Sequence, residues 1–197
     1  MKNNRLKKWL PCQGYCQMNG AAAAVLSFKN TKVVFNGPRW CSVIAERELM
    51  AYNRNLTERL YCSHIEQTEL LFGTGEKIRE IIEHQQRENP NTSLLAVLTS
   101  CSVGLIGDDV HGIISTVEEI YPVIIMDAGG LTGLFEEGYQ AVMLEILKKQ
   151  QLKKSPARNP KKVNLLGYCA YYPHSRGDLT EMKRLLAEAG FELGVRS

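Results

Sequence analysis

Short apolar runs alternate along this chain with segments of helical periodicity, and this alternation constrains the fold more than any other feature. The clearest example is 94–109, where the run Leu-Leu-Ala-Val-Leu leads through two small polar residues and Cys101 into a helical pattern. Runs that are apolar at every position are typical of parallel strands, because such strands are buried on both faces of a sheet. The order strand, turn, helix recurs at 32–54 and 122–149. It predicts an α/β fold with a three-layer, mainly parallel Rossmann-like sheet and helices on both faces.

Turn-forming residues and apolar spacing divide the chain into predicted elements. We expect strands at 32–36, 69–73, 94–98 and 122–127, and helices at 21–26, 42–54, 76–87, 103–120 and 133–149. Residues 1–20 are expected to form an irregular amino-terminal segment, 21–150 the α/β domain, and 151–162 a basic, proline-containing linker. A strand at 163–167, a helix at 179–189 and a short strand at 191–195 would begin a second α/β domain. This domain is expected to be truncated, because a strand–helix–strand piece is too small to be stable alone.

The net charge of +3 is distributed unevenly along the chain. Residues 1–10 carry four positive charges and residues 148–162 carry seven, and neither segment contains an acidic residue. The rest of the chain is therefore acidic. Nucleic-acid binding would require a basic face on a folded element, so we interpret both basic segments as solvated and expect no nucleic-acid partner.

No apolar run approaches the roughly 20 residues that a membrane-spanning helix requires, so no membrane segment is expected. The basic start of the chain leads into Pro11 and Cys12 and not into the apolar stretch of a signal peptide. We therefore expect a cytoplasmic location.

The chain has six cysteines: Cys12, Cys16, Cys41, Cys62, Cys101 and Cys169. A disulfide framework is not expected in a reducing compartment, which leaves metal ligands, redox groups or small buried residues. Cys41 and Cys101 share one setting, since each follows a predicted strand and a turn and begins a predicted helix. The carboxyl ends of parallel strands bind ligands in open α/β sheets, and the amino end of a helix favours a thiolate.

Four segments with recognisable motifs occur in a fixed order: 15–20 (YCQMNG), 36–41 (NGPRWC), 71–77 (LFGTGEK) and 99–109 (TSCSVGLIGDD). Together they resemble the amino-terminal domain of the nitrogenase component 1 type oxidoreductases. This family includes the nitrogenase molybdenum–iron protein subunits, the cofactor-assembly scaffold of nitrogenase and the dark-operative protochlorophyllide reductase. The resemblance covers about residues 12–150, and the linker and the strand and helix after it also fit. Cys16, Cys41 and Cys101 are separated by 25 and 60 positions.

The resemblance implies that Cys16, Cys41 and Cys101 bind an iron–sulfur cluster of four or eight irons. A homologous or identical subunit would supply the remaining ligands. It also implies that the cluster relays electrons from an ATP-dependent iron–sulfur reductase protein to a substrate or cofactor site in further domains. This chain alone is expected to be inactive. The alternative functions are a non-catalytic cluster-binding scaffold or assembly module, and a nucleotide-binding α/β domain with incidental cysteines.

Other polar residues have simpler interpretations. Cys12 could replace Cys16 as a ligand, whereas Cys62 and Cys169 are expected to be packing residues. The four histidines lack metal-binding spacing, and Asp108 and Asp109 are expected to favour a helix start. Gly104 and Gly107 would permit a close backbone approach. Asp127, Gly129 and Gly130 form a turn at a strand end that could bind phosphate or a metal, although no nucleotide motif surrounds it.

Overall fold

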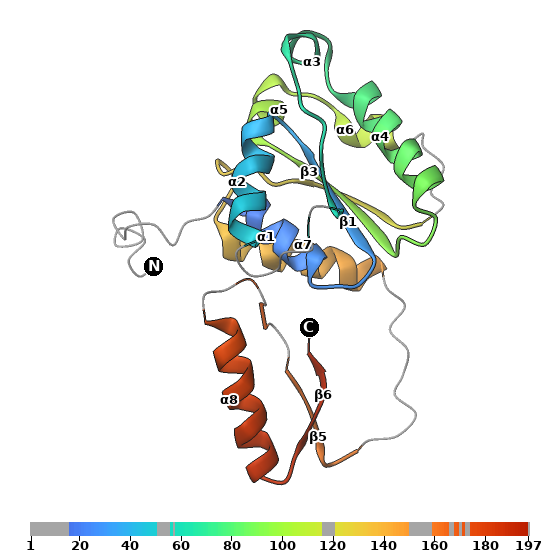
Figure 1. Ribbon diagram of the computed structural model, residues 1–197. Coiled ribbons are helices and arrows are strands. Elements are labelled where there is room, and N and C mark those ends of the chain that lie inside the picture. Colours follow the sequence, from blue (N-terminus) through green and yellow to red (C-terminus); the bar gives the residue numbers. More distant parts are fainter. Residues whose placement is uncertain are drawn as a thin grey trace, which may run out of the picture.

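A four-stranded parallel sheet forms the centre of the chain. The computed structural model describes residues 16–50, 56, 58–115, 121–149, 159–165, 168–169, 171 and 174–196 (Figure 1). The strand order is β2–β1–β3–β4, and every neighbouring pair is parallel. The strands are β1 (Thr31–Asn36), β2 (Leu60–Cys62), β3 (Leu94–Thr99) and β4 (Val123–Asp127). The predicted α/β class with a mainly parallel sheet is confirmed.

Helices cover both faces of the sheet, and each face has its own apolar core. One core joins Phe35 and Leu98 of the sheet to helices α1 (Gln17–Leu26), α2 (Arg39–Met50) and α7 (Phe135–Lys149). The other joins Val34 and Val97 to helices α4 (Gly75–Glu88), α5 (Cys101–Ile106) and α6 (Val110–Ile114). Adjacent strand residues enter opposite cores because side chains alternate across a sheet.

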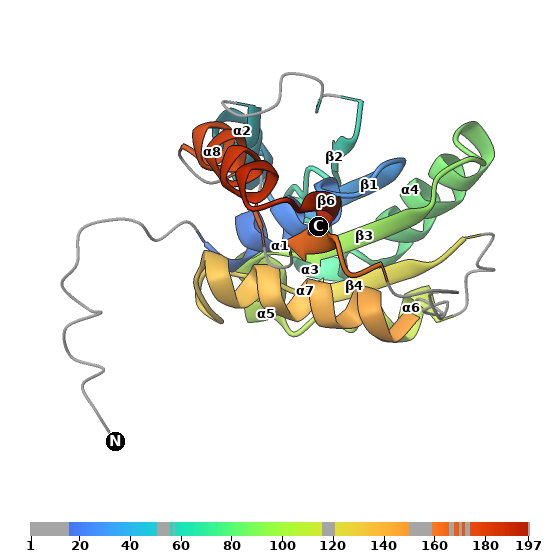
Figure 2. The ribbon, with the colours of Figure 1, turned by 90° about the horizontal axis from the view of Figure 1, so that it is seen from below.

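Helix α1 is buried along its whole length, from Gln17 to Leu26. Figure 2 shows it side by side with α7. The two helices touch through glycines: a Cβ on Gly20 would lie 1.8 Å from the carbonyl oxygen of Phe135, and one on Gly138 would lie 1.9 Å from that of Gln17. Glycine is therefore required at both positions for the two backbones to approach so closely.

The strand predicted at 69–73 is wrong. This segment forms helix α3 (Gln67–Phe72), and the missed strand β2 precedes it. The helix begins with a capping box, in which the Glu66 side chain accepts from the backbone of Glu69 and the Glu69 side chain accepts from the Glu66 N–H. Such reciprocal bonds satisfy two of the unpaired N–H groups at a helix start. Because none of its residues is buried, the apolar run of α3 does not belong to the core.

The single helix predicted at 103–120 is also wrong. Gly107 has a φ of +71°, in the left-handed region that favours glycine, and it ends α5 after six residues. A second short helix, α6, follows, and the predicted segment 116–120 lies outside the described residues. Helix α1 begins at Gln17, earlier than the predicted start at residue 21.

Near the carboxyl terminus, β5 (Lys162–Leu165), α8 (Ser175–Glu188) and β6 (Glu192–Arg196) form the predicted strand, helix and strand, with the two strands parallel. Cys169 and Tyr171 are buried against the core that contains α1, and the Tyr171 hydroxyl lies 3.5 Å from the carbonyl oxygen of Leu26. The predicted linker falls mostly outside the described residues. None of the helices in the described ranges has the length and hydropathy needed to span a bilayer.

We predict that Gly20→Ala destabilises the protein by about 1–3 kcal/mol or more, because the added methyl group must push α1 away from the α7 backbone. Urea unfolding would measure the loss. Gly177→Ala in α8 is the matched control, since a Cβ there would meet no described atom within 4 Å and alanine favours a helix by about 0.5–1 kcal/mol. Equal stability of the two variants would contradict the inferred contact between α1 and α7.

Candidate functional site

Cys41 and Cys101 lie at the same edge of the sheet. Cys101 is the first residue of α5, two residues after β3 ends at Thr99, and Cys41 is in the first turn of α2, after β1 ends at Asn36. Asn36 and Thr99 are partners in the parallel register of β1 and β3. Both cysteines are therefore placed beyond the carboxyl ends of neighbouring strands, at helix starts, as the sequence predicts.

Cys16 lies at this edge as well, although it precedes all the strands in the sequence. It is the residue before α1, and it forms an isolated antiparallel bridge with Leu134, next to the start of α7. The Gln17 N–H donates to the Gly133 carbonyl oxygen at 3.1 Å. The first turn of α1 is thereby attached to the loop that follows β4.

The loop after β4 contacts two of the three cysteines through glycines. A Cβ on Gly129 would lie 2.7 Å from the Cys101 sulfur and 2.8 Å from the Cys101 nitrogen, and a Cβ on Gly130 would lie 3.1 Å from the Cys16 Cβ. A side chain at position 129 would therefore displace Cys101, and one at position 130 would make a tight contact with Cys16. By contrast, a Cβ on Gly104 or Gly107, the two glycines predicted to permit a close approach, would have no described atom within 4 Å.

The thiols are close enough to interact electrostatically. Burial raises the pKa of the Cys41 thiol, and the negative charges that Cys16, Cys101 and Cys62 carry as thiolates raise it further. Each of these four cysteines is partly exposed. Several thiolates crowded together repel one another, and a bound cationic metal group would offset that repulsion.

The donor set at this edge consists of thiols, which as thiolates are the usual ligands of iron–sulfur clusters. Within the described ranges, no three His, Cys, Asp or Glu side chains converge on a point where one metal ion would bind. In an iron–sulfur cluster the thiolates bind different irons, so they need not converge in that way. Cys16, Cys41 and Cys101 are all partly buried, and two of them lie against the loop after β4, so their chemistry fits such a group. Cys12 lies outside the described residues.

Comparison with known proteins gives an independent result. Residues 16–197 match the family model described as Nitrogenase component 1 type Oxidoreductase. This chain belongs to that family. The match begins at Cys16 and continues through the carboxyl-terminal strand and helix, in agreement with the resemblance found in the sequence motifs.

Individual relatives are identical to this chain at about a quarter of the aligned positions. The nitrogenase iron-iron protein beta chain of Rhodobacter capsulatus is 25% identical over 87% of this chain and 38% of the relative. A subunit of the light-independent protochlorophyllide reductase of Chlorobium phaeobacteroides is 24% identical over 90% of this chain and 33% of its own length. The chain thus spans less than half of these two oxidoreductase subunits.

A solved structure titled "Nitrogenase Cp1 at pH 5" has the same fold. It superposes with a TM-score of 0.72 at 21% identity, over 93% of this chain and 38% of that chain. The family fold therefore extends over nearly the whole chain.

Cys62 and Cys169 pack against the core as expected. Asp109 caps the helix that follows it, whereas Asp108 bonds to the start of a different helix, α4. Cys169 is buried, and the Cys62 sulfur at the end of β2 accepts from the His64 N–H at 3.3 Å. Asp108 accepts from the N–H and hydroxyl of Thr74 at the start of α4, both at 2.6 Å. Asp109 accepts from the Gly112 N–H at 2.9 Å in α6.

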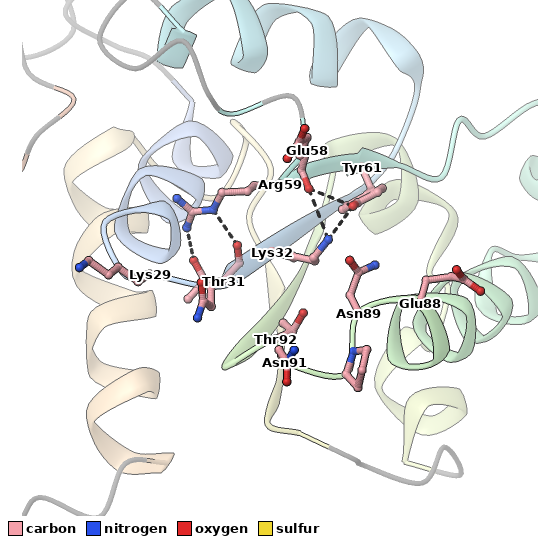
Figure 3. A pocket seen from close by; sticks show the side chains of 12 residues that line it. Lys29, Thr31, Lys32, Glu58, Arg59, Tyr61, Glu88, Asn89, Asn91 and Thr92 are labelled. Carbon is pink, nitrogen blue, oxygen red and sulfur yellow. Dashed lines mark hydrogen bonds between the residues drawn. The ribbon is translucent and has the colours of Figure 1, made fainter.

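A polar hollow of about 1070 Å³ lies at the opposite edge of the sheet, where β1, β2 and β3 begin (Figure 3). Its most deeply placed cations are already bound by the protein. Arg59 donates to the carbonyl oxygens of Leu26, Phe28 and Thr31, and Lys32 donates to the Tyr61 hydroxyl at 2.7 Å. Since these groups are held by internal partners, the hollow is a weaker candidate site than the cysteine edge.

Large apolar side chains are exposed around the cysteine edge. Trp40 precedes Cys41 and is 71% exposed, Leu105 follows Cys101 in α5, and Leu131 follows Gly130. Leu71 and Phe72, at the end of α3, are exposed as well. The exposure of the α3 side chains could not be predicted from the sequence, because the apolar run of this helix has the composition of a buried strand. Groups of exposed apolar side chains mark interaction surfaces.

We predict that the carboxylate of Glu69 stabilises α3 and that this stabilisation depends on pH. Bonds from Lys77 Nζ at 2.8 Å and from the Glu66 N–H lower the pKa of Glu69 from 4.5 to about 2. The stabilisation is therefore complete above about pH 4.5 and is lost as the pH falls towards 2. The difference in free energy of unfolding between the native chain and Glu69→Gln, measured in urea, should shrink over that range.

Glu76→Gln provides the control for this experiment, because the Glu76 side chain is 77% exposed and pairs with Arg79 at the surface. Such pairs contribute little to stability. A Glu69→Gln difference that stays constant from pH 7 down to pH 2.5 would show that the carboxylate of Glu69 does not stabilise α3 as described.

Proposed function

We propose that this chain is part of an oxidoreductase subunit that binds an iron–sulfur cluster at a subunit interface and relays electrons through it. Cys16, Cys41 and Cys101 are the proposed ligands. The observation that carries the proposal is the meeting of these cysteines at one sheet edge, where Gly129 and Gly130 contact two of them. Membership of the family supports the oxidoreductase role.

The proposed ligands have distinct structural supports. Cys101 is held at the start of α5 by β3, Cys41 by the turn between β1 and α2, and Cys16 by its bridge to Leu134. Thiolates are the usual ligands of iron–sulfur groups, and such a group, when bound, accepts and releases single electrons. Three ligands from one chain leave coordination to be completed by another subunit.

The proposed partner is a homologous or identical subunit that covers the cysteine edge. The family relatives include a nitrogenase alpha chain of Clostridium pasteurianum as well as beta chains, which supports association between related subunits. The exposed side chains of Trp40, Leu105 and Leu131 would be buried in that interface. We further propose an ATP-dependent iron–sulfur reductase protein as the electron donor, and a substrate or cofactor site outside the part of the relatives that this chain matches.

The ligand assignment can be tested by anaerobic reconstitution with iron and sulfide in the presence of the homologous subunit. We expect iron–sulfur absorption and an electron paramagnetic resonance signal in the native chain. Cys41→Ala combined with Cys101→Ala should abolish both, because two of the three proposed ligands are removed. Cys169→Ala is the control, since this thiol is buried at 4% exposure and is not a proposed ligand.

A signal that survives the double substitution would contradict the ligand set. Failure of the native chain and its homologous subunit to take up iron and sulfide at all would contradict the proposed function. In that case the scaffold and nucleotide-binding alternatives would have to be tested directly.

The proposed interface predicts an effect of Trp40 on subunit association. Trp40→Ala should weaken binding of the homologous subunit at least ~10-fold, because buried tryptophans contribute strongly to interfaces. Leu185→Ala, at an exposed position of α8, should leave binding unchanged. Sedimentation or titration calorimetry would measure both, and equal effects of the two substitutions would place the interface elsewhere.

A further inference from the structure

A buried hydroxyl next to Cys101 lacks a hydrogen-bond partner. Ser100 is 2% exposed, and its Oγ has no partner among the described residues. The residue precedes α5, where a serine commonly caps the helix through its side chain, yet no such bond is present. Burying a hydroxyl without a partner costs free energy, so this group calls for an explanation.

The side chain of Ser100 is on the same side of the sheet as α1 and α2. Side chains alternate along β3: Leu98 enters the core with α1, α2 and α7, Thr99 is on the opposite face, and Ser100 returns to the first face. Asn36, the register partner of Thr99, bonds to Thr74 at the start of α4, which identifies that opposite face.

The hydroxyl also lies against the turn that leads to Cys41. A Cβ on Gly37 would be 2.5 Å from the Ser100 Oγ. Gly37 is followed by Pro38, whose carbonyl oxygen accepts from the Cys41 N–H at 3.0 Å. Ser100 is thus adjacent in sequence to Cys101 and adjacent in space to the turn that positions Cys41.

We propose that the Ser100 hydroxyl donates a hydrogen bond to a sulfur atom of the iron–sulfur group, either a cysteine thiolate or an inorganic sulfide. This inference rests on the proposed function. A hydrogen bond to sulfur stabilises the more negative, reduced state and so raises the reduction potential. Ser100 would thereby set the potential at which the site accepts an electron, without itself binding iron.

The reconstituted chain, assembled with its homologous subunit, allows a direct test by redox titration followed by electron paramagnetic resonance. Ser100→Ala should shift the reduction potential to a more negative value with the iron content unchanged. Ser100→Thr keeps the hydroxyl and should restore the native potential. Thr99→Val is the matched control, because Thr99 is also 2% exposed and its Oγ1 has no partner in the described part of the chain, but it is on the other face of the sheet.

An unchanged potential in Ser100→Ala would overturn the inference while leaving the proposed function intact. Equal shifts in Ser100→Ala and Thr99→Val would also overturn it, since the effect would then not be specific to the cysteine side of the sheet. An equal shift in Ser100→Ala and Ser100→Thr would show that the hydroxyl is not responsible. Absence of any cluster in the native assembly would instead overturn the proposed function on which the inference depends.

Discussion

The backbone contact between α1 and α7 is the constraint on which the candidate site depends. Cys16 lies far from Cys101 in sequence, and it reaches the same sheet edge because α1 packs directly on α7 through Gly20 and Gly138. Side chains at these glycines would push the two helices apart. The Cys16–Leu134 bridge lies at the start of the same helix pair, so the packing of this face and the placement of one proposed ligand have a common cause.

Much of the fold could be predicted from periodicity, because buried parallel strands are apolar at every position. The runs around Val33, Val97 and Ile124 predict strands for this reason, since residues of each strand enter both apolar cores. The run Leu70-Leu71-Phe72 has the same pattern without being a strand. Its residues are apolar but exposed, and a single sequence does not distinguish a side chain buried in its own core from one available to another subunit.

The site was only partly accessible to sequence reasoning. Cys41 and Cys101 stand out because each follows a strand and begins a helix, whereas Cys16 was identified through the family motif. The contact of Gly129 with Cys101 depends on how the loop after β4 folds across β3, a tertiary approach that leaves no local pattern. The Ser100 hydroxyl likewise becomes visible as a buried group only once the turn at Gly37 is placed beside it.

Arg59 gives the proposed site a further property. Its guanidinium binds the Leu26 and Phe28 carbonyl oxygens at the carboxyl end of α1, while Gly133 and Leu134 hold the amino end. Helix α1 is therefore anchored at both ends and carries Cys16 on a rigid support. A ligand that is already fixed loses little conformational entropy when it binds, so more of the metal–thiolate bond energy remains as affinity. Arg59, at one edge of the sheet, thus contributes to the pre-organisation of Cys16 at the opposite edge.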